Sequence, residues 1–168
     1  MKKLFVVLAM ALALAGCKAK PEVDLSVEGD FDIEKYLGEW YEIARFDFSY
    51  ERGMTRCKSK YAVRWDGVME FVSTGFKHGE PKYAKGGIKT SDVPRILRFS
   101  YWGPTYSDYR ILMIDDDYTW ALIGGDDAKH LWILSRTPEM QEAVRDTILA
   151  EAVRRGFDTS KFVWTEQK

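Results

Sequence analysis

The chain has 168 residues, a formal net charge of −1 and an aromatic content of 14%, with 6 Trp and 9 Tyr. A net charge near zero leaves no electrostatic footprint for nucleic acid, so we exclude a nucleic-acid partner. The length suits a single domain, and the aromatic side chains supply apolar area that can fill its core or line a cavity.

Residues 1–16 have the pattern of a secretory signal peptide. Two lysines precede an apolar run over 4–14, which is too short to span a bilayer, since spanning takes roughly 20 apolar residues. The run ends in Leu-Ala-Gly-Cys at Cys17 and resembles the lipobox of bacterial lipoproteins. The resemblance implies cleavage before Cys17 and acylation of that cysteine; the alternative is an ordinary signal peptide with an incidental cysteine.

Lys18 follows the cysteine. Lipoproteins with Asp at that position tend to stay at the inner membrane, so the resemblance implies anchoring at the outer membrane, facing the periplasm. Residues 17–29 contain Pro21 and mixed charges, and we expect a flexible tether there. Residues 30–168 then form the folded domain.

Eight runs rich in Tyr, Phe, Val, Ile and Trp follow at a spacing of about 8–12 residues, with Gly, Pro and Asp between them, and predict strands. The runs are 38–47, 57–65, 68–77, 82–90, 95–102, 108–114, 118–124 and 129–136. An even number of hairpin-connected strands favours an all-β, eight-stranded, up-and-down antiparallel barrel without an open edge. A barrel of that size has room inside for side chains or for one small ligand.

A helix and a short final strand are predicted after the barrel. Thr137 is a suitable N-cap and Pro138 a suitable first helical residue, while Gly156 is typical of a helix end. The apolar positions, spaced four apart, are Met140, Val144, Ile148 and Ala152. Such a stripe must be buried, and the outer wall of the barrel is the surface available to it. Residues 161–164 predict the last strand.

Three short motifs resemble those of the lipocalin family. Gly38-Glu39-Trp40 matches the opening Gly-x-Trp, 114–121 resembles the second block, and Arg136 is the arginine of the third block at the end of the eighth strand. The surrounding sequence is most similar to the bacterial outer-membrane lipocalins, which are related to apolipoprotein D and to plant temperature-induced lipocalins. The resemblance implies that Trp40 closes the bottom of the barrel, that Arg136 stacks on it, and that Gly38 permits close packing.

That group holds a fatty acid or lysophospholipid in its barrel, so the resemblance implies binding, storage or transport of such lipids at the cell envelope. Its members also form dimers, and a homodimer is a further expectation. The residues expected to contact the ligand are Glu42, Tyr61, Phe99, Tyr101, Tyr106, Tyr109, Met113 and Trp132. They lie on predicted inward faces, since alternate strand residues share a face, or match pocket aromatics of the group, as Tyr106 and Trp132 do.

Several of these positions allow two interpretations. Glu42 either orients a polar head group or forms hydrogen bonds within the barrel. Phe99, Tyr101, Tyr109 and Met113 either line a cavity or fill it. Tyr106 either meets a head group or packs in a turn.

Two other functions are compatible with parts of the sequence. Cys57, between Arg56 and Lys58, could serve as a nucleophile in a lipid-modifying enzyme, but no general base accompanies it, so we do not expect an enzyme. Haem or pigment would also suit a barrel, yet no histidine falls on a plausible inward face. His78 and His130 are isolated and predicted to lie at the surface. We therefore expect no cofactor and no metal.

Overall fold

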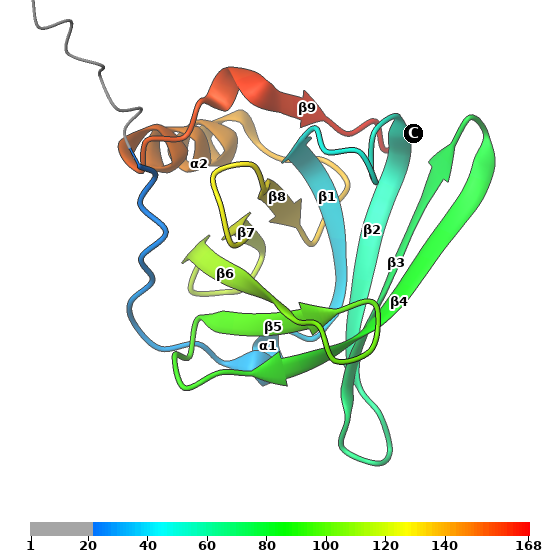
Figure 1. Cartoon of the computed structure of the whole chain (residues 1–168). Helices are drawn as coiled ribbons and strands as arrows, with labels where there is room; N and C mark the ends of the chain where they lie inside the picture. Colours follow the sequence, from blue (N-terminus) through cyan, green and yellow to red (C-terminus); the bar gives the residue numbers. More distant parts are fainter. Residues whose placement is uncertain (1–21) are drawn as a thin grey trace, which may run out of the picture.

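The computed structural model describes residues 22–168 and shows a closed antiparallel barrel with a helix and an extra strand outside it (Figure 1). The signal peptide and the acylated Cys17 lie outside the described residues and stay predictions. The strands are β1 (Gly38–Phe46), β2 (Met54–Val63), β3 (Met69–Lys77), β4 (Glu80–Thr90), β5 (Ile96–Ser100), β6 (Ser107–Ile114), β7 (Trp120–Gly124), β8 (Leu131–Ser135) and β9 (Phe162–Trp164). The helices are α1 (Ile33–Tyr36), α2 (Glu142–Arg154) and the 3-10 turn η1 (Thr159–Lys161).

Each strand from β2 to β8 pairs with the next, and β1 pairs with both β8 and β2, which closes the ring. The all-β, eight-stranded barrel predicted from the sequence is confirmed. The start of β1, Gly38–Tyr41, pairs with β2, whereas its end, Ala44–Phe46, pairs with β9. After Tyr41, β1 separates from β2, and β9 takes the place of β2 as its hydrogen-bonded neighbour.

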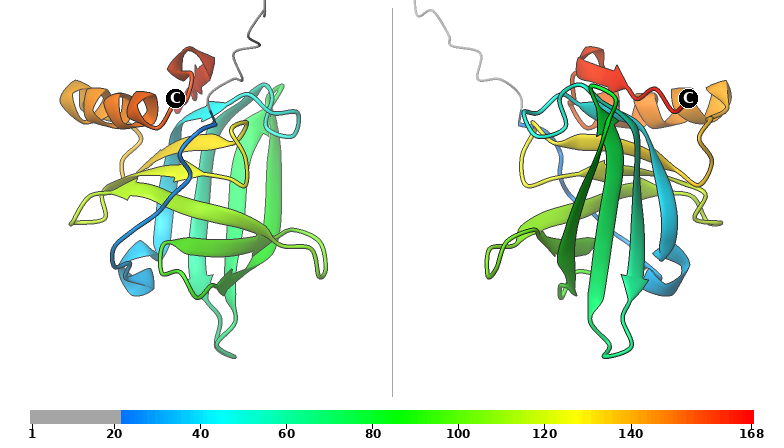
Figure 2. Two further views of the ribbon diagram at one scale, coloured as in Figure 1. Left: turned by 60° about the vertical axis from the view of Figure 1, so that its left-hand side comes forward. Right: turned by 90° about the vertical axis from the view of Figure 1, so that its right-hand side faces the viewer.

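Two hydrophobic cores lie on opposite sides of the barrel wall. The inner core includes Trp40, Tyr61 and Phe71 and fills one end of the barrel. The outer core packs the wall against α2 and β9, which lie outside the barrel in both views of Figure 2. Ile148 and Ala152 of the predicted helical stripe are fully buried there, so the helix covers the outer wall as expected.

The start of α2 was predicted too early. Thr137 does not cap the helix; its backbone N–H donates to Ser135 Oγ at 3.1 Å and its hydroxyl donates to the Glu139 carbonyl at 2.7 Å. These local bonds hold a turn, and the helix begins only at Glu142. The helix ends at Arg154, and Gly156 stops it just beyond the C-cap as predicted, with a φ of +88° that suits a residue without a side chain.

Residues 22–29 do not form a free tether. They run along the outside of the barrel from the end of α2 to α1 (Figures 1 and 2). The apolar side chains packed against the outer core are Val23, Leu25 and Val27. The Asp24 N–H donates to the Arg155 carbonyl at 2.8 Å, and Arg155 Nη1 donates to the Ser26 carbonyl at 2.7 Å. The expectation of little order was wrong here because alternate apolar residues give this segment a face to bury.

The end of the barrel beside α1 is closed by a stacked pair of side chains. The guanidinium of Arg136 lies 3.9 Å from the centre of the Trp40 ring, as the resemblance implied. Its nitrogens also donate to the carbonyls of Lys35 at 2.7 Å and Glu39 at 2.9 Å. Gly38 has a φ of +99°, and a Cβ there would lie 3.2 Å from Arg136 Nη1. A side chain at Gly38 would both strain the backbone and press on the arginine.

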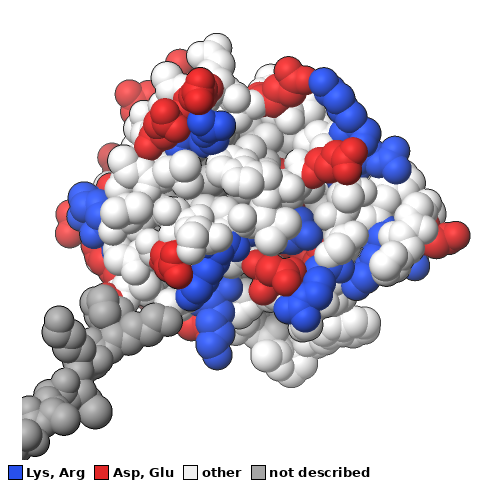
Figure 3. All heavy atoms as spheres, turned by 90° about the horizontal axis from the view of Figure 1, so that it is seen from above, with Lys and Arg blue, Asp and Glu red and all other residues white. Residues whose placement is uncertain are grey.

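Charged side chains are interspersed over the surface. On the face seen from above, Lys and Arg alternate with Asp and Glu, and no patch of one sign dominates (Figure 3). Within residues 22–168 no helix is long and apolar enough to cross a membrane.

Candidate functional site

The end of the barrel opposite α1 contains a cavity of about 700 Å³. This volume lies within the range of small-molecule sites, roughly 300–1,000 Å³. Its rim comes from the three loops 47–53, 101–106 and 125–130, and its walls come from inward side chains of the strands. The barrel is therefore filled at one end and hollow at the other.

The floor of the cavity is built from stacked aromatic rings. The rings of Phe99 and Tyr109 are parallel with centroids 4.3 Å apart, and Phe71 stacks on Phe99 at 4.9 Å. The Tyr109 hydroxyl forms hydrogen bonds with those of Tyr36 at 3.0 Å and Tyr61 at 3.1 Å. Because the phenols satisfy one another, the floor presents mainly ring carbon to the space above it.

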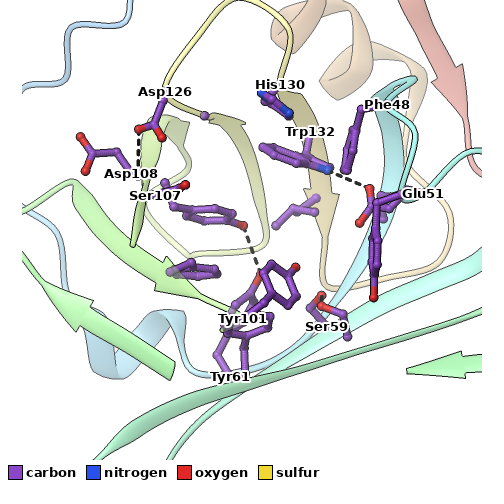
Figure 4. Close-up of a pocket in the computed structure, with 18 of the residues that line it drawn as sticks. Phe48, Glu51, Ser59, Tyr61, Tyr101, Ser107, Asp108, Asp126, His130 and Trp132 are labelled. Atoms are coloured by element: carbon purple, nitrogen blue, oxygen red, sulfur yellow. Dashed lines mark hydrogen bonds between the residues drawn. The ribbon is translucent and has the colours of Figure 1, made fainter. Parts of the chain in front are cut away.

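Six of the eight residues predicted to contact a ligand line this cavity. They are Glu42, Tyr61, Phe99, Tyr101, Tyr109 and Trp132. Tyr61, Phe99 and Tyr109 do so as the upper layer of the inner core, so they both fill the barrel and line the hollow. Tyr101 is more exposed than these three, and its ring forms a T-shaped pair with Phe71 at 4.8 Å; Figure 4 shows it beside Tyr61.

Met113 was placed on the wrong face. Pairing of β6 with β7 shifts register between Ile111 and Met113, which marks a β-bulge at Leu112. The extra residue reverses the alternation, so Ile111 stays in the inner core while Leu112 and Met113 face the outer core. Met113 therefore packs against the outer core and not in the cavity.

Tyr106 also lies away from the cavity. Lys89 Nζ sits 4.4 Å from the centre of its ring. Lys89 follows the inward Ile88 on β4 and so points to the outer face. Tyr106 therefore packs against the outside of the wall, which corresponds to the turn-packing interpretation.

Glu42 takes part in a buried polar network. Its Oε1 accepts from Arg45 Nη1 at 2.6 Å and from the Thr165 hydroxyl at 2.6 Å. Arg45 is 1% exposed and donates from Nη2 to the Glu51 carbonyl at 2.7 Å. Hydrogen bonding within the barrel accounts for this carboxylate, although Glu42 also forms part of the cavity wall.

Glu51 is a cavity residue that the sequence did not reveal. Its Oε2 accepts from Trp132 Nε1 at 3.2 Å, a bond visible in Figure 4, and lies 3.9 Å from Arg45 Nε. Burial, followed by the nearby charge of Glu42, raises the pKa of Glu51 to about 8. The loop 47–53 has no periodic pattern, so nothing in the sequence indicated that this carboxyl group turns inward.

The rim carries further residues that were not predicted. Phe48 lies edge-on to Trp132 at 5.6 Å, and the His130 ring is stacked near Trp132 at 5.9 Å. His130 Nδ1 forms a hydrogen bond with Asp127 Oδ1 at 2.8 Å. His130 is thus at the cavity rim and not merely on the outer surface. Within residues 22–168 no group of three or more His, Cys, Asp or Glu side chains could hold a metal ion.

Cys57 is buried and close to acidic groups. Desolvation raises the pKa of its thiol to about 12, and the charge of Glu42 adds to this rise. The neighbouring Arg56 is exposed and does not offset it. The thiol form therefore dominates at neutral pH, contrary to the thiolate that its basic sequence neighbours favoured.

A second, smaller cavity of about 180 Å³ adjoins the first. The residues that line both are Glu42, Tyr50, Glu51, Ser59, Ser73 and Tyr101. Beyond them it extends between β2, β3 and β4 toward Lys77 and Lys82. The larger cavity thus has a side chamber at its upper edge.

Residues 31–167 match the lipocalin-like domain family. The chain belongs to the lipocalin family. Outer membrane lipoprotein Blc of Escherichia coli K12 is 38% identical over 163 residues, which cover 95% of this chain and 92% of that protein. The protein of the same name from Vibrio cholerae is 34% identical and covers 100% of both chains.

Solved structures agree on the fold of this lipocalin. The crystal structure of the cockroach allergen Per a 4 superimposes with a TM-score of 0.69 at 21% identity, covering 84% of this chain and 94% of the other. Both bacterial relatives are named outer membrane lipoproteins, which is the class of protein that the motif ending at Cys17 and the following Lys18 predict for this chain.

Proposed function

We propose that this lipocalin binds a single-chain lipid, a fatty acid or a lysophospholipid, with its tail in the 700 Å³ cavity. The main evidence for this proposal is a cavity whose floor consists of stacked aromatic rings, with tyrosine hydroxyls that form hydrogen bonds with one another. Such a floor presents an apolar surface to an alkyl chain, and its hydroxyl groups need no hydrogen bond from the ligand.

The apolar tail supplies most of the binding free energy. Each methylene moved from water into the cavity contributes about 0.8 kcal/mol, so a 16-carbon chain gains on the order of 10 kcal/mol before ordering costs. That gain suffices for a micromolar or tighter complex. The lipid would enter between the three rim loops, where Trp132 and Phe48 flank the opening.

We further propose carriage and not catalysis as its role. The strongest candidate for a nucleophile was Cys57, and burial keeps it as a thiol. An acyl anchor at Cys17 would hold the barrel at the outer membrane, where lipids that leave the bilayer are close at hand. A single binding site of this kind would serve storage, transport or scavenging of such lipids equally. The expected homodimer remains a prediction.

Fluorescence titration tests the proposal. Trp132 lies in the cavity wall, so binding of a 16-carbon lysophospholipid should change tryptophan emission in a saturable way. Shortening the chain by one methylene should weaken binding about fourfold, which is 0.8 kcal/mol expressed as a ratio. Affinity that does not depend on chain length would contradict burial of the tail.

A pair of variants provides the control. Ser73 faces the cavity, whereas Val72 is its neighbour on the opposite face of β3. Ser73→Trp should block lipid uptake and Val72→Trp should leave it unchanged, while near-UV circular dichroism shows that both variants are folded. Equal binding by the two variants would rule out the cavity as the site.

A further inference from the structure

Two lysines on neighbouring strands, the half-buried Lys77 and the exposed Lys82, line the side chamber. Lys82 pairs with Gly75, and Lys77 follows Gly75 by two residues, so all three share one face of the β3–β4 hairpin. A Cβ added at Gly75 would meet Met54 and the buried Cys57, so this face is the inner one. Both lysines line the chamber.

These lysines carry charges that the protein leaves uncompensated. Within residues 22–168 no carboxylate lies within 4.0 Å of the ammonium group of Lys77 or Lys82, although Glu80 is the register partner of Lys77. The third lysine of the chamber, Lys58, is engaged by Glu39 at 3.0 Å. Inward-facing lysines next to a cavity therefore have donors available for an anion.

The rim of the main cavity is acidic. The carboxyl groups that line this cavity belong to Glu42, Glu51, Asp108, Asp126 and Asp127, of which Glu51 keeps its proton below about pH 8. Glu42 and Glu51 also line the side chamber, whereas no Lys or Arg of the described chain lines the main cavity. Arg45, Arg98 and Arg110 pair with some of these carboxylates from outside the lining. An anionic group would thus be disfavoured beside the rim acids and attracted to the side chamber.

We infer that Lys77 and Lys82 form a subsite for the anionic head group, phosphate or carboxylate, of a lipid whose tail fills the main cavity. The subsite rests on the proposed function and specifies it. The two cavities meet at Ser59, Ser73 and Tyr101, so one amphiphile can occupy both. Ala84 lies on the same face as Lys82 and lines the chamber, where its small side chain leaves space for the head group.

The test compares lipids of equal chain length that have or lack an anionic group in the head. Lys77→Gln/Lys82→Gln should bind lysophosphatidylcholine or palmitate about tenfold more weakly than the wild type, as expected for loss of charge-assisted hydrogen bonds. Monopalmitoylglycerol has no anion, so its affinity should stay within about twofold, because its head group loses no charged partner. Lys77→Arg/Lys82→Arg should retain tight binding of lysophosphatidylcholine and of palmitate.

Lys60→Gln is the matched control. It removes one lysine charge from the exposed outer face of β2, where Lys60 alternates with the inward Ser59 and Tyr61, and should change no affinity. A loss confined to lysophosphatidylcholine identifies phosphate as the natural anion, and a loss confined to palmitate identifies carboxylate.

Three outcomes would overturn the subsite. The first is undiminished binding of both lysophosphatidylcholine and palmitate by the Lys77→Gln/Lys82→Gln protein. The second is an equal loss of affinity for monopalmitoylglycerol, and the third is an equal effect of Lys60→Gln. None of these touches the proposed function, which would fail separately if the wild-type protein bound no single-chain lipid at all.

Discussion

Replacing Glu51 by glutamine should change how the stability of this lipocalin depends on pH. The Glu51 carboxyl group lies in the cavity wall with a side chain 17% exposed, and it accepts a hydrogen bond from Trp132. Burial and the neighbouring Glu42 raise its pKa from 4.5 to about 8. The amide of the variant would keep a hydrogen-bond acceptor at this position but would carry no titrating proton.

The sign and the size of the effect follow from proton binding. Between pH 4.5 and about 8 the unfolded chain loses the Glu51 proton while the folded protein keeps it. The folded state then binds more protons, so the free energy of unfolding falls as pH rises, by up to about 1.4 kcal/mol per pH unit. The shift of the pKa from 4.5 to about 8 limits the total loss of unfolding free energy between these two pH values to about 5 kcal/mol.

Urea unfolding at pH 5, 6, 7 and 8 measures the effect. The difference in unfolding free energy between the Glu51→Gln variant and the wild type should grow in favour of the variant as pH rises, and its slope should decrease as pH approaches 8. Glu28→Gln removes one carboxylate from an exposed position outside the cavity and controls for the change in net charge. Parallel curves for Glu51→Gln and the wild type would refute the reasoning.

Two further substitutions and one reactivity measurement have definite expected results. Gly86→Ala would drive a Cβ into the carbonyl oxygen of Ser100 and should lower the free energy of unfolding by about 1–3 kcal/mol in urea; an unchanged midpoint would contradict this overlap. Arg136→Lys should cost about 2 kcal/mol, because a lysine cannot both stack on Trp40 and reach several carbonyls, and an unaltered melting temperature would argue against that role. Cys57, with a pKa of about 12 against an ordinary 9, should react with iodoacetamide at pH 8 about a thousandfold more slowly in the folded protein than in urea, and comparable rates would show that the thiolate forms readily.

The barrel could be predicted because its strands repeat one local pattern. Gly38–Phe46 and the seven later strands each combine alternation with turn residues at both ends, and pairing of neighbours in the chain then leaves little choice of topology. The contact of Trp40 with Arg136 was available only through the lipocalin motifs, since the two residues lie at opposite ends of the strand series and no local pattern links them.

The rim of the cavity could not be predicted in the same way. Phe48, Glu51 and His130 come from loops, where no period tells which side chains turn inward. Their positions depend on tertiary contacts such as the Arg45 bond to the Glu51 carbonyl. Tyr106 is the opposite case. It was predicted to contact the ligand, but its ring packs against Lys89 outside the cavity.

A second bulge explains how an arginine reaches the cavity edge. In β1 the pairing with β8 shifts between Glu42 and Ala44, so Ile43 is the extra residue. Strict alternation after Trp40 and Glu42 would turn Ala44 inward and Arg45 outward, whereas the bulge sends Ala44 to the outer core. Arg45 then faces inward, bonds Glu42 and supports the loop that carries Glu51. One inserted residue therefore supports a hydrogen-bonded polar edge between the aromatic floor and the lysine chamber, which is the feature that the proposed lipid with a charged head group requires.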